Sequence, residues 1–128
     1  MSLKELITEF NNTAISLAEQ LSTICPNTVI SNNVSNLKML IGHDSEKLIE
    51  LFTLYVLPDK AEIDSGNADY FMGKIKKEKK TDENEALIKD AFEFKHIWNK
   101  LDDMNKTFVI QYMQCLCYYA QQYFLLKY

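Results

Sequence analysis

The stretch of sequence that decides the fold is TFVIQYMQCLCYYAQQYFLL, residues 107–126, in which twenty consecutive residues carry no charge. That length would allow the segment to span a membrane. However, four glutamines and several tyrosines are interleaved with its apolar side chains, which argues against a lipid environment. The segment instead predicts one long helix over residues 103–127 that the rest of the chain surrounds.

Placed on a helical wheel, this predicted helix divides into a broad inward face and a narrow uncharged wedge. The inward face holds apolar and aromatic residues, namely Phe108, Val109, Tyr112, Met113, Cys115, Leu116, Tyr119, Ala120, Tyr123 and Phe124. The wedge consists of Gln111, Gln114, Tyr118, Gln121, Gln122 and Leu125. Interface cores are depleted in charge and enriched in tyrosine, so we interpret the wedge as a binding surface for a protein partner or for a second copy of the chain. The alternative is that the wedge packs inside the bundle.

The N-terminal part of the chain predicts two further helices. Residues 3–24 carry an apolar side chain at every third or fourth position, which is typical of an amphipathic helix. Pro26 ends this helix because proline cannot donate a helical hydrogen bond. Residues 28–41 form a second, weaker helix, and Gly42 is the glycine expected just after its end.

A third helix is expected between two local signals. Asp44 or Ser45 is its predicted cap, because short polar side chains accept hydrogen bonds from the first backbone N–H groups of a helix. Pro58 is its predicted stop. The following residues, 59–66, are predicted to form a loop.

A single helical turn with two aromatic side chains follows that loop. Asp69 is its expected cap and Gly73 its expected end. The turn carries Tyr70 and Phe71, which we expect either to cover the core or to contact a partner.

The segment over residues 74–85 is predicted to be a charged linker, because it contains five lysines, four acidic residues and one apolar residue. After it, a helix over residues 84–101 would turn its apolar residues to one side, namely Leu87, Ala91, Phe94, Trp98 and Leu101. Residues 1–128 are therefore predicted to form a single all-α domain. It is a compact bundle of five or six helices around the long uncharged C-terminal helix.

The charged residues restrict the classes of function. The chain contains 14 lysines, no arginine and 18 acidic residues, so its net charge is −4. Arginine suits bidentate contacts with bases, so its absence argues against sequence-specific recognition of nucleic acid. A lysine run leaves open an alternative function, that of a nucleic-acid-associated factor that contacts phosphates. Its members are Lys74, Lys76, Lys77, Lys79 and Lys80.

No residue pattern of an enzyme, a metal site or a cofactor site is present. His43 and His96 have no cysteine, histidine or carboxylate at ligand spacing. Asp102 and Asp103 lie where the last helix begins, so we interpret them as cap residues. We therefore predict a non-catalytic protein without a cofactor or metal. The three cysteines lack the spacing of a disulfide framework, which predicts reduced thiols and an intracellular location.

Two segments, DSEKLIELFTLYVLPDKAEIDSGNADYFMGK (residues 44–74) and FKHIWNKLDDMNKTFVIQYMQCLCYYAQQY (residues 94–123), together resemble uncharacterised small helical proteins of giant nucleocytoplasmic DNA viruses. The resemblance implies a helical architecture and a viral structural or accessory role, in the cytoplasm or in the virion, but no activity and no site residue. Helical-bundle modulators of host signalling or apoptosis are an alternative of matching size. Their Asn-Trp-Gly-Arg signature is missing from this sequence.

Overall fold

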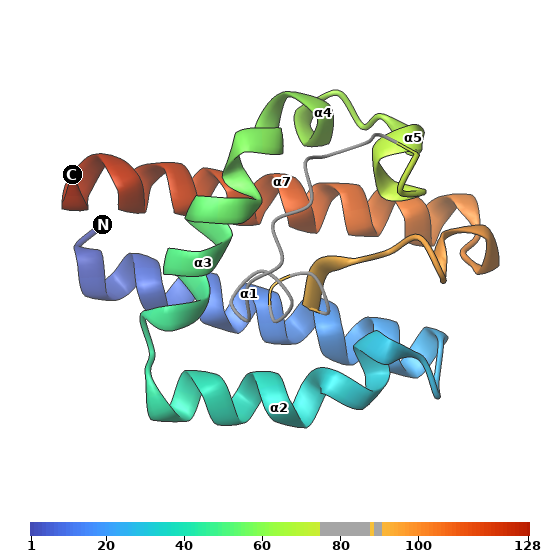
Figure 1. Cartoon of the computed structure of the whole chain (residues 1–128), viewed down its shortest axis with the longest axis horizontal. Coiled ribbons are helices and arrows are strands. Elements are labelled where there is room, and N and C mark those ends of the chain that lie inside the picture. Colours follow the sequence, from blue (N-terminus) through green and yellow to red (C-terminus); the bar gives the residue numbers. More distant parts are fainter. Residues whose placement is uncertain (75–87, 89–90) are drawn as a thin grey trace.

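The computed structural model describes residues 1–74, 88 and 91–128 (Figure 1). Within these ranges the chain forms six α-helices, two short 3₁₀-helices and no strand, which confirms the predicted all-α bundle. The elements are α1 (Leu3–Ile24), α2 (Val29–His43), α3 (Lys47–Tyr55), η1 (Leu57–Asp59), α4 (Lys60–Asp64), α5 (Ala68–Phe71), η2 (Trp98–Lys100) and α7 (Asp103–Lys127).

The two longest helices, α1 and α7, lie side by side and run in opposite directions, so both chain ends lie at one end of the bundle (Figure 1). Helix α2 packs along another side of α1. Helix α3 crosses from α2 to α7, and α4 then packs on α7. Helix α7 is thus in contact with α1, α3 and α4.

Helix α1 has the predicted limits, and local signals explain its start. The hydroxyl of Ser2 accepts a hydrogen bond from the backbone N–H of Glu5 (3.2 Å), and a carboxylate oxygen of Glu5 accepts one from the N–H of Ser2 (3.3 Å). This capping box satisfies two N–H groups that have no partner within the helix, and its hydrogen bonds lower the pKa of Glu5. Phe10, Ala14 and Leu17 of the predicted stripe are buried.

Helix α2 begins after a tight turn in which Asn27 has a φ of 64°. Thr28 caps it by accepting a hydrogen bond from the N–H of Ser31 (3.3 Å). The prediction that Gly42 follows the helix is wrong, because Gly42 lies within α2 and Asp44 is the C-cap. Asp44 continues in extended backbone (φ −143°), so the chain leaves the helix without a left-handed residue.

The predicted caps of α3 are also wrong in detail. Glu46 is the N-cap residue and makes no capping hydrogen bond with its side chain. Asp44 instead closes the turn before the helix, since its carboxylate accepts a hydrogen bond from the N–H of Glu46 (3.1 Å). The carbonyl of Ser45 accepts a hydrogen bond from the side-chain amide of Asn11 (2.8 Å), which ties this turn to α1.

The region predicted as a loop over residues 59–66 contains the short helix α4. Five residues are too few for a helix that is stable by itself. Burial of Ile63 in the core supplies the tertiary support. Lys60 also pairs with Asp64 one turn later, and this hydrogen bond raises the pKa of Lys60.

Helix α5 is capped by Asn67, and the prediction of Asp69 is wrong. The side-chain oxygen of Asn67 accepts a hydrogen bond from the N–H of Asp69 (3.0 Å), and its nitrogen donates to a carboxylate oxygen of Glu62 (2.8 Å). An aspartate lacks the donor for the second bond, so the amide both caps α5 and joins it to α4. Gly73 follows with a φ of 71°, as expected for the glycine that closes the turn.

The prediction of a continuous helix over residues 84–101 is wrong for its second part, and most of its first part, including Leu87, lies outside the described residues. The helical geometry stops after Phe92. The carbonyl of Phe94 then accepts hydrogen bonds from the N–H groups of Ile97 (3.1 Å) and Trp98 (2.9 Å), and η2 follows. Phe94, Ile97, Trp98 and Leu101 therefore keep the three- and four-residue spacing that a helix would give them. Their side chains are all buried.

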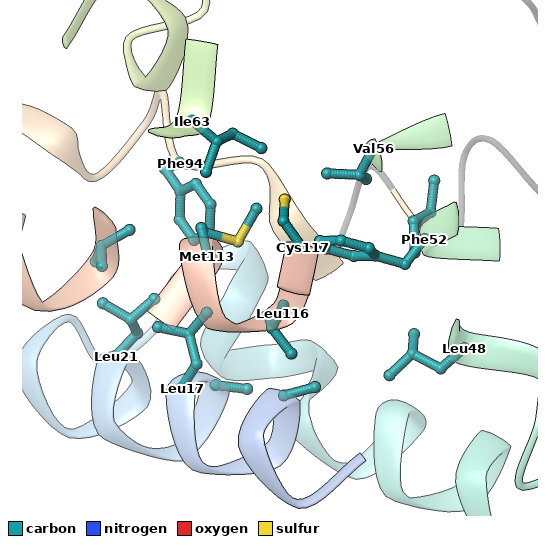
Figure 2. Packing of buried hydrophobic residues seen from close by; sticks show 14 of the residues in the cluster. Leu17, Leu21, Leu48, Phe52, Val56, Ile63, Phe94, Met113, Leu116 and Cys117 are labelled. Atoms are coloured by element: carbon teal, nitrogen blue, oxygen red, sulfur yellow. The ribbon is translucent and has the colours of Figure 1, made fainter. Parts of the chain in front are cut away.

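Helix α7 has the predicted limits. Asp102 caps it by accepting a hydrogen bond from the N–H of Asn105 (2.8 Å). Figure 2 shows side chains of α7 among those of α1, α3, α4 and the segment around Phe94. The buried residues of α7 are Val109, Met113, Leu116, Cys117, Ala120 and Tyr123.

The buried face of α7 is therefore rotated relative to the predicted one. Cys117, which the wheel left outside the inward face, is fully buried, and Figure 2 shows it on the side of Val56 and Phe52. Phe124, which was predicted to face inward, is exposed and lies against the ring of Tyr128 (centroids 5.4 Å apart). The rotation follows from α3 and α4, which pack on α7 beside α1. Four residues of the predicted inward face are only half-buried, namely Phe108, Tyr112, Cys115 and Tyr119.

We expect Phe71→Ala to lower the free energy of unfolding by about 3–5 kcal/mol, the usual cost of removing a buried aromatic ring. The ring of Phe71 is buried and stacks on that of Trp98 (centroids 5.0 Å apart, 12° between planes). Urea denaturation followed by circular dichroism measures the change. The control is Leu54→Ala at an exposed position of α3, which we expect to change the free energy of unfolding by less than about 1 kcal/mol. Equal effects of the two substitutions would contradict this assignment of the core.

Candidate interaction surface

The side of α7 that faces away from the core carries a row of four residues spaced seven apart. Met104, Tyr118 and Leu125 have relative exposures of 76%, 57% and 64%, and Gln111 is also exposed. A spacing of seven residues is close to two helical turns, so these side chains lie above one another along the helix. We call these four residues the outer ridge.

The surface beside the outer ridge is uncharged as well. Thr107 and Gln121 are exposed, and Gln122 is half-buried. Lys106 is the one charged residue between Met104 and Leu126. It is half-buried on another side of the helix, where its ammonium group lies 5.8 Å from the ring centre of Trp98. A charge-free strip therefore runs along most of α7.

Gln114 belongs to the predicted wedge but makes hydrogen bonds within the fold. Its side-chain nitrogen donates hydrogen bonds to the backbone carbonyls of Ile63 (3.2 Å) and Asp64 (3.1 Å). These carbonyls lie at the end of α4, where that of Ile63 also accepts a hydrogen bond from the N–H of Gly66 (3.1 Å). Gln114 thus fixes α4 on α7, in contrast to the exposed Gln111 and Gln121.

The structure also shows the orientation of the helical turn that carries Tyr70 and Phe71. Phe71 is buried in the core and does not offer a surface to a partner. Tyr70 is half-buried, and its hydroxyl donates a hydrogen bond to a carboxylate oxygen of Asp59 (3.0 Å). Burial and the nearby Asp59 raise the pKa of Tyr70. The turn therefore covers the core, which is the first of its two predicted roles.

Of the lysine run, the structure describes only Lys74, which is exposed; Lys76, Lys77, Lys79 and Lys80 lie outside the described residues. The segment from residue 91 to residue 106 does not add a basic surface. It carries as many acidic residues as lysines, namely Glu93, Asp102 and Asp103 against Lys95, Lys100 and Lys106. The described residues thus give no extended positive patch beside Lys74.

A second group of polar side chains gathers where α4 meets α7, around the buried Cys117. Burial and the nearby carboxylate of Asp64 raise the pKa of Cys117 to about 12. Because the thiolate is the reactive form, a thiol with this pKa is a poor nucleophile at neutral pH. The described residues hold no group of three or more side chains suited to a metal ion. The thiol of Cys117 in this cluster is therefore protonated at neutral pH.

The remaining features are the three cysteines, the two histidines and the length and apolarity of the helices. Cys25, Cys115 and Cys117 are all free thiols. His43 and His96 are exposed, and the Nε2 atom of His96 lies 3.8 Å from a carboxylate oxygen of Glu93. None of the helices in the described ranges combines the length and apolarity that crossing a membrane requires.

No family model, curated protein or solved structure matches this chain. Its function is therefore inferred from its own residues and their geometry. Met104 is the ridge residue that the sequence reasoning missed, because it precedes the uncharged stretch that starts at Thr107. The seven-residue spacing of Met104 from Gln111, Tyr118 and Leu125 is the signal that would have identified it.

We expect Gln114→Ala to lower the free energy of unfolding by about 1 kcal/mol, because the carbonyls of Ile63 and Asp64 each lose a hydrogen bond from its side-chain nitrogen. Gln111→Ala is the matched control on the same helix, and we expect it to change this free energy by less than about 0.5 kcal/mol. Chemical denaturation of both variants provides the comparison. A cost for Gln111→Ala as large as that for Gln114→Ala would show that the assignment is wrong.

Stability should fall as the pH rises from about 9 toward 12. The raised pKa of Cys117 means that its thiol stays protonated in the folded protein after the same thiol has ionised in the unfolded chain. The folded state then binds more protons, so the free energy of unfolding decreases with increasing pH. Tyr70, whose pKa is also raised, acts in the same direction.

Denaturation curves recorded across this pH range, for the parent chain and for Cys117→Ala, test the expectation. The variant should be less stable at neutral pH, because a buried side chain has been shortened. Its stability should decline less steeply above pH 9. A parallel decline in both proteins would exclude Cys117 as a contributor.

Proposed function

We propose that this chain is a non-catalytic interaction protein that binds another protein through the outer ridge of α7. The observation that carries the proposal is the exposure of Met104, Tyr118 and Leu125 in one row on a strip without charge. Exposed apolar side chains that line up in one patch, rimmed by polar residues, are typical of protein interaction sites, whereas single ones are not. Within this proposal the chain acts as a structural or accessory component, as its resemblance to small helical viral proteins implies.

The residue types on the ridge suit protein recognition. Tyrosine at position 118 offers a large rigid ring and a hydroxyl group, a combination that is common among residues with large contributions to binding. The flexible side chain of Met104 adapts to the shape of a partner. The amide of Gln111 forms hydrogen bonds without the desolvation cost of a charge. A helix laid along α7 would contact all four ridge positions, because side chains seven residues apart form a straight row.

A non-catalytic role is supported by the chemistry of the described polar groups. The buried Cys117 has a raised pKa, and Gln114 is engaged with α4. Asp102 is engaged as the cap of α7. Gln114 and Asp102 thus have structural roles, and the thiol of Cys117 is protonated at neutral pH.

Site-specific photo-crosslinking tests the proposal. A photoreactive phenylalanine analogue replaces Tyr118 on the ridge in one variant and Met39 in the control variant. Met39 lies on α2 with a relative exposure of 71%. In an extract of the cells in which the chain is naturally made, we expect covalent adducts with a protein from position 118 but not from position 39.

The adducts should also depend on the rest of the ridge. Leu125→Lys, introduced together with the photoreactive group at position 118, should reduce the adducts strongly, because an unpaired charge would be buried on binding. Equal adduct yields from both positions, or none from position 118 both in the extract and with the purified chain at about 1 mM, would contradict the proposed surface.

A further inference from the structure

We propose that the molecule covering the outer ridge is a second copy of this chain, with the two α7 helices packed antiparallel about a two-fold axis. This inference rests on the proposed function and names its partner. It follows from three properties of the ridge: its charge, the positions of its residues along α7 and its area.

The charge distribution leaves the strip along α7 as the surface where a second copy can bind. The chain carries a net charge of −4, so two copies repel each other over most orientations. The strip along α7 has no charged residue among its exposed side chains from Met104 to Leu125. When two such strips meet, no charge is buried without a partner, and burial of an unpaired charge would be the largest cost of association.

The positions of the ridge residues are symmetric along the helix. The midpoint of the ridge lies between Gln114 and Cys115, halfway between Met104 and Leu125. In an antiparallel pair centred there, Met104 of one copy lies opposite Leu125 of the second copy. Gln111 likewise lies opposite Tyr118 of the second copy. Apolar side chains thus meet each other at both ends, and an amide meets a ring with a hydroxyl group near the centre.

A parallel arrangement is disfavoured by the charges at the start of α7. It would place Asp102 and Asp103 of the two copies next to each other, and like charges repel. The antiparallel arrangement separates these acids by roughly the length of α7, about 36 Å at 1.5 Å per residue. It also opposes the two helix dipoles, which is the favourable arrangement.

The area of the ridge predicts a weak, reversible dimer. The ridge spans about 32 Å along a helix about 10 Å wide, which corresponds to roughly 300 Å² from each copy. Specific stable interfaces bury about 1,200–2,000 Å² in total, so this contact lies in the range of transient complexes. We expect a dissociation constant of the order of 100 µM.

Sedimentation velocity of the purified full chain tests the dimer. Between about 10 µM and about 1 mM, we expect the mean mass to rise from that of a monomer toward that of a dimer. Leu125→Glu should raise the dissociation constant by about tenfold or more. The matched control is Leu54→Glu, because Leu54 of α3 has a similar relative exposure of 60%. It should leave the dissociation constant unchanged.

A charge-pair experiment tests the antiparallel orientation. Gln111→Lys and Tyr118→Glu should each weaken the dimer, because each places an unpaired charge in the contact. The double variant should recover most of the affinity, since Lys at 111 then faces Glu at 118 of the second copy. Within one chain these positions are about 10 Å apart along the helix, so they do not pair with each other. A parallel dimer would instead be weakest in the double variant. Circular dichroism establishes that each variant is folded.

The outcomes separate this inference from the proposed function. A chain that stays monomeric at about 1 mM, or a dimer that Leu54→Glu weakens as much as Leu125→Glu, overturns the antiparallel dimer. If position 118 still forms crosslinks to a different protein, the proposed function stands and only the identity of the partner is wrong. If the chain is monomeric and no crosslink forms from position 118, both fail.

Discussion

The antiparallel packing of α1 against α7 organises this protein. Phe10, Ala14 and Leu17 of α1 are buried, as are Leu116 and Ala120 of α7. Burial of each large apolar side chain contributes about 1.5–3 kcal/mol relative to leaving it exposed. The other elements are added around this pair: α2 on α1, and α3 and α4 on α7. Among the residues that the structure describes, this packing leaves one side of α7 exposed along most of its length.

The absence of charge over residues 107–126 of α7 matters on both sides of the helix. On the inner side it allows Met113, Leu116 and Tyr123 to be buried without the cost of an ionised group. On the outer side it leaves a ridge that another uncharged surface can cover. The charges of α7 are placed at its ends, where Asp102 caps the helix and Lys127 pairs with Glu46 of the turn before α3. A charged residue in the middle of the helix would disturb either the core or the ridge.

The limits of α1 and α7 could be predicted because their signals are local. An apolar side chain at every third or fourth position, the proline after α1 and the aspartate before α7 act over a few residues. Caps were harder to assign where several polar residues compete. Asn67 was missed in favour of Asp69, because its advantage is a second hydrogen bond to Glu62 of α4, which no local pattern reveals. The outer ridge was predicted for Gln111, Tyr118 and Leu125 and missed for Met104, which lies before the uncharged stretch.

The sequence by itself determined the helical class, the long uncharged helix and most of its exposed residues, because hydrophobic periodicity and charge are properties of neighbouring residues. Only the tertiary structure decided where the helix before Trp98 ends, since no glycine or proline follows Gly73 in the chain. It also decided that Phe71 stacks on Trp98 and that Gln114 binds α4, while Gln111, one turn earlier, stays exposed. These outcomes depend on contacts between residues far apart in the chain. Such contacts determine how α7 is rotated in the bundle, and hence which side chains it leaves exposed.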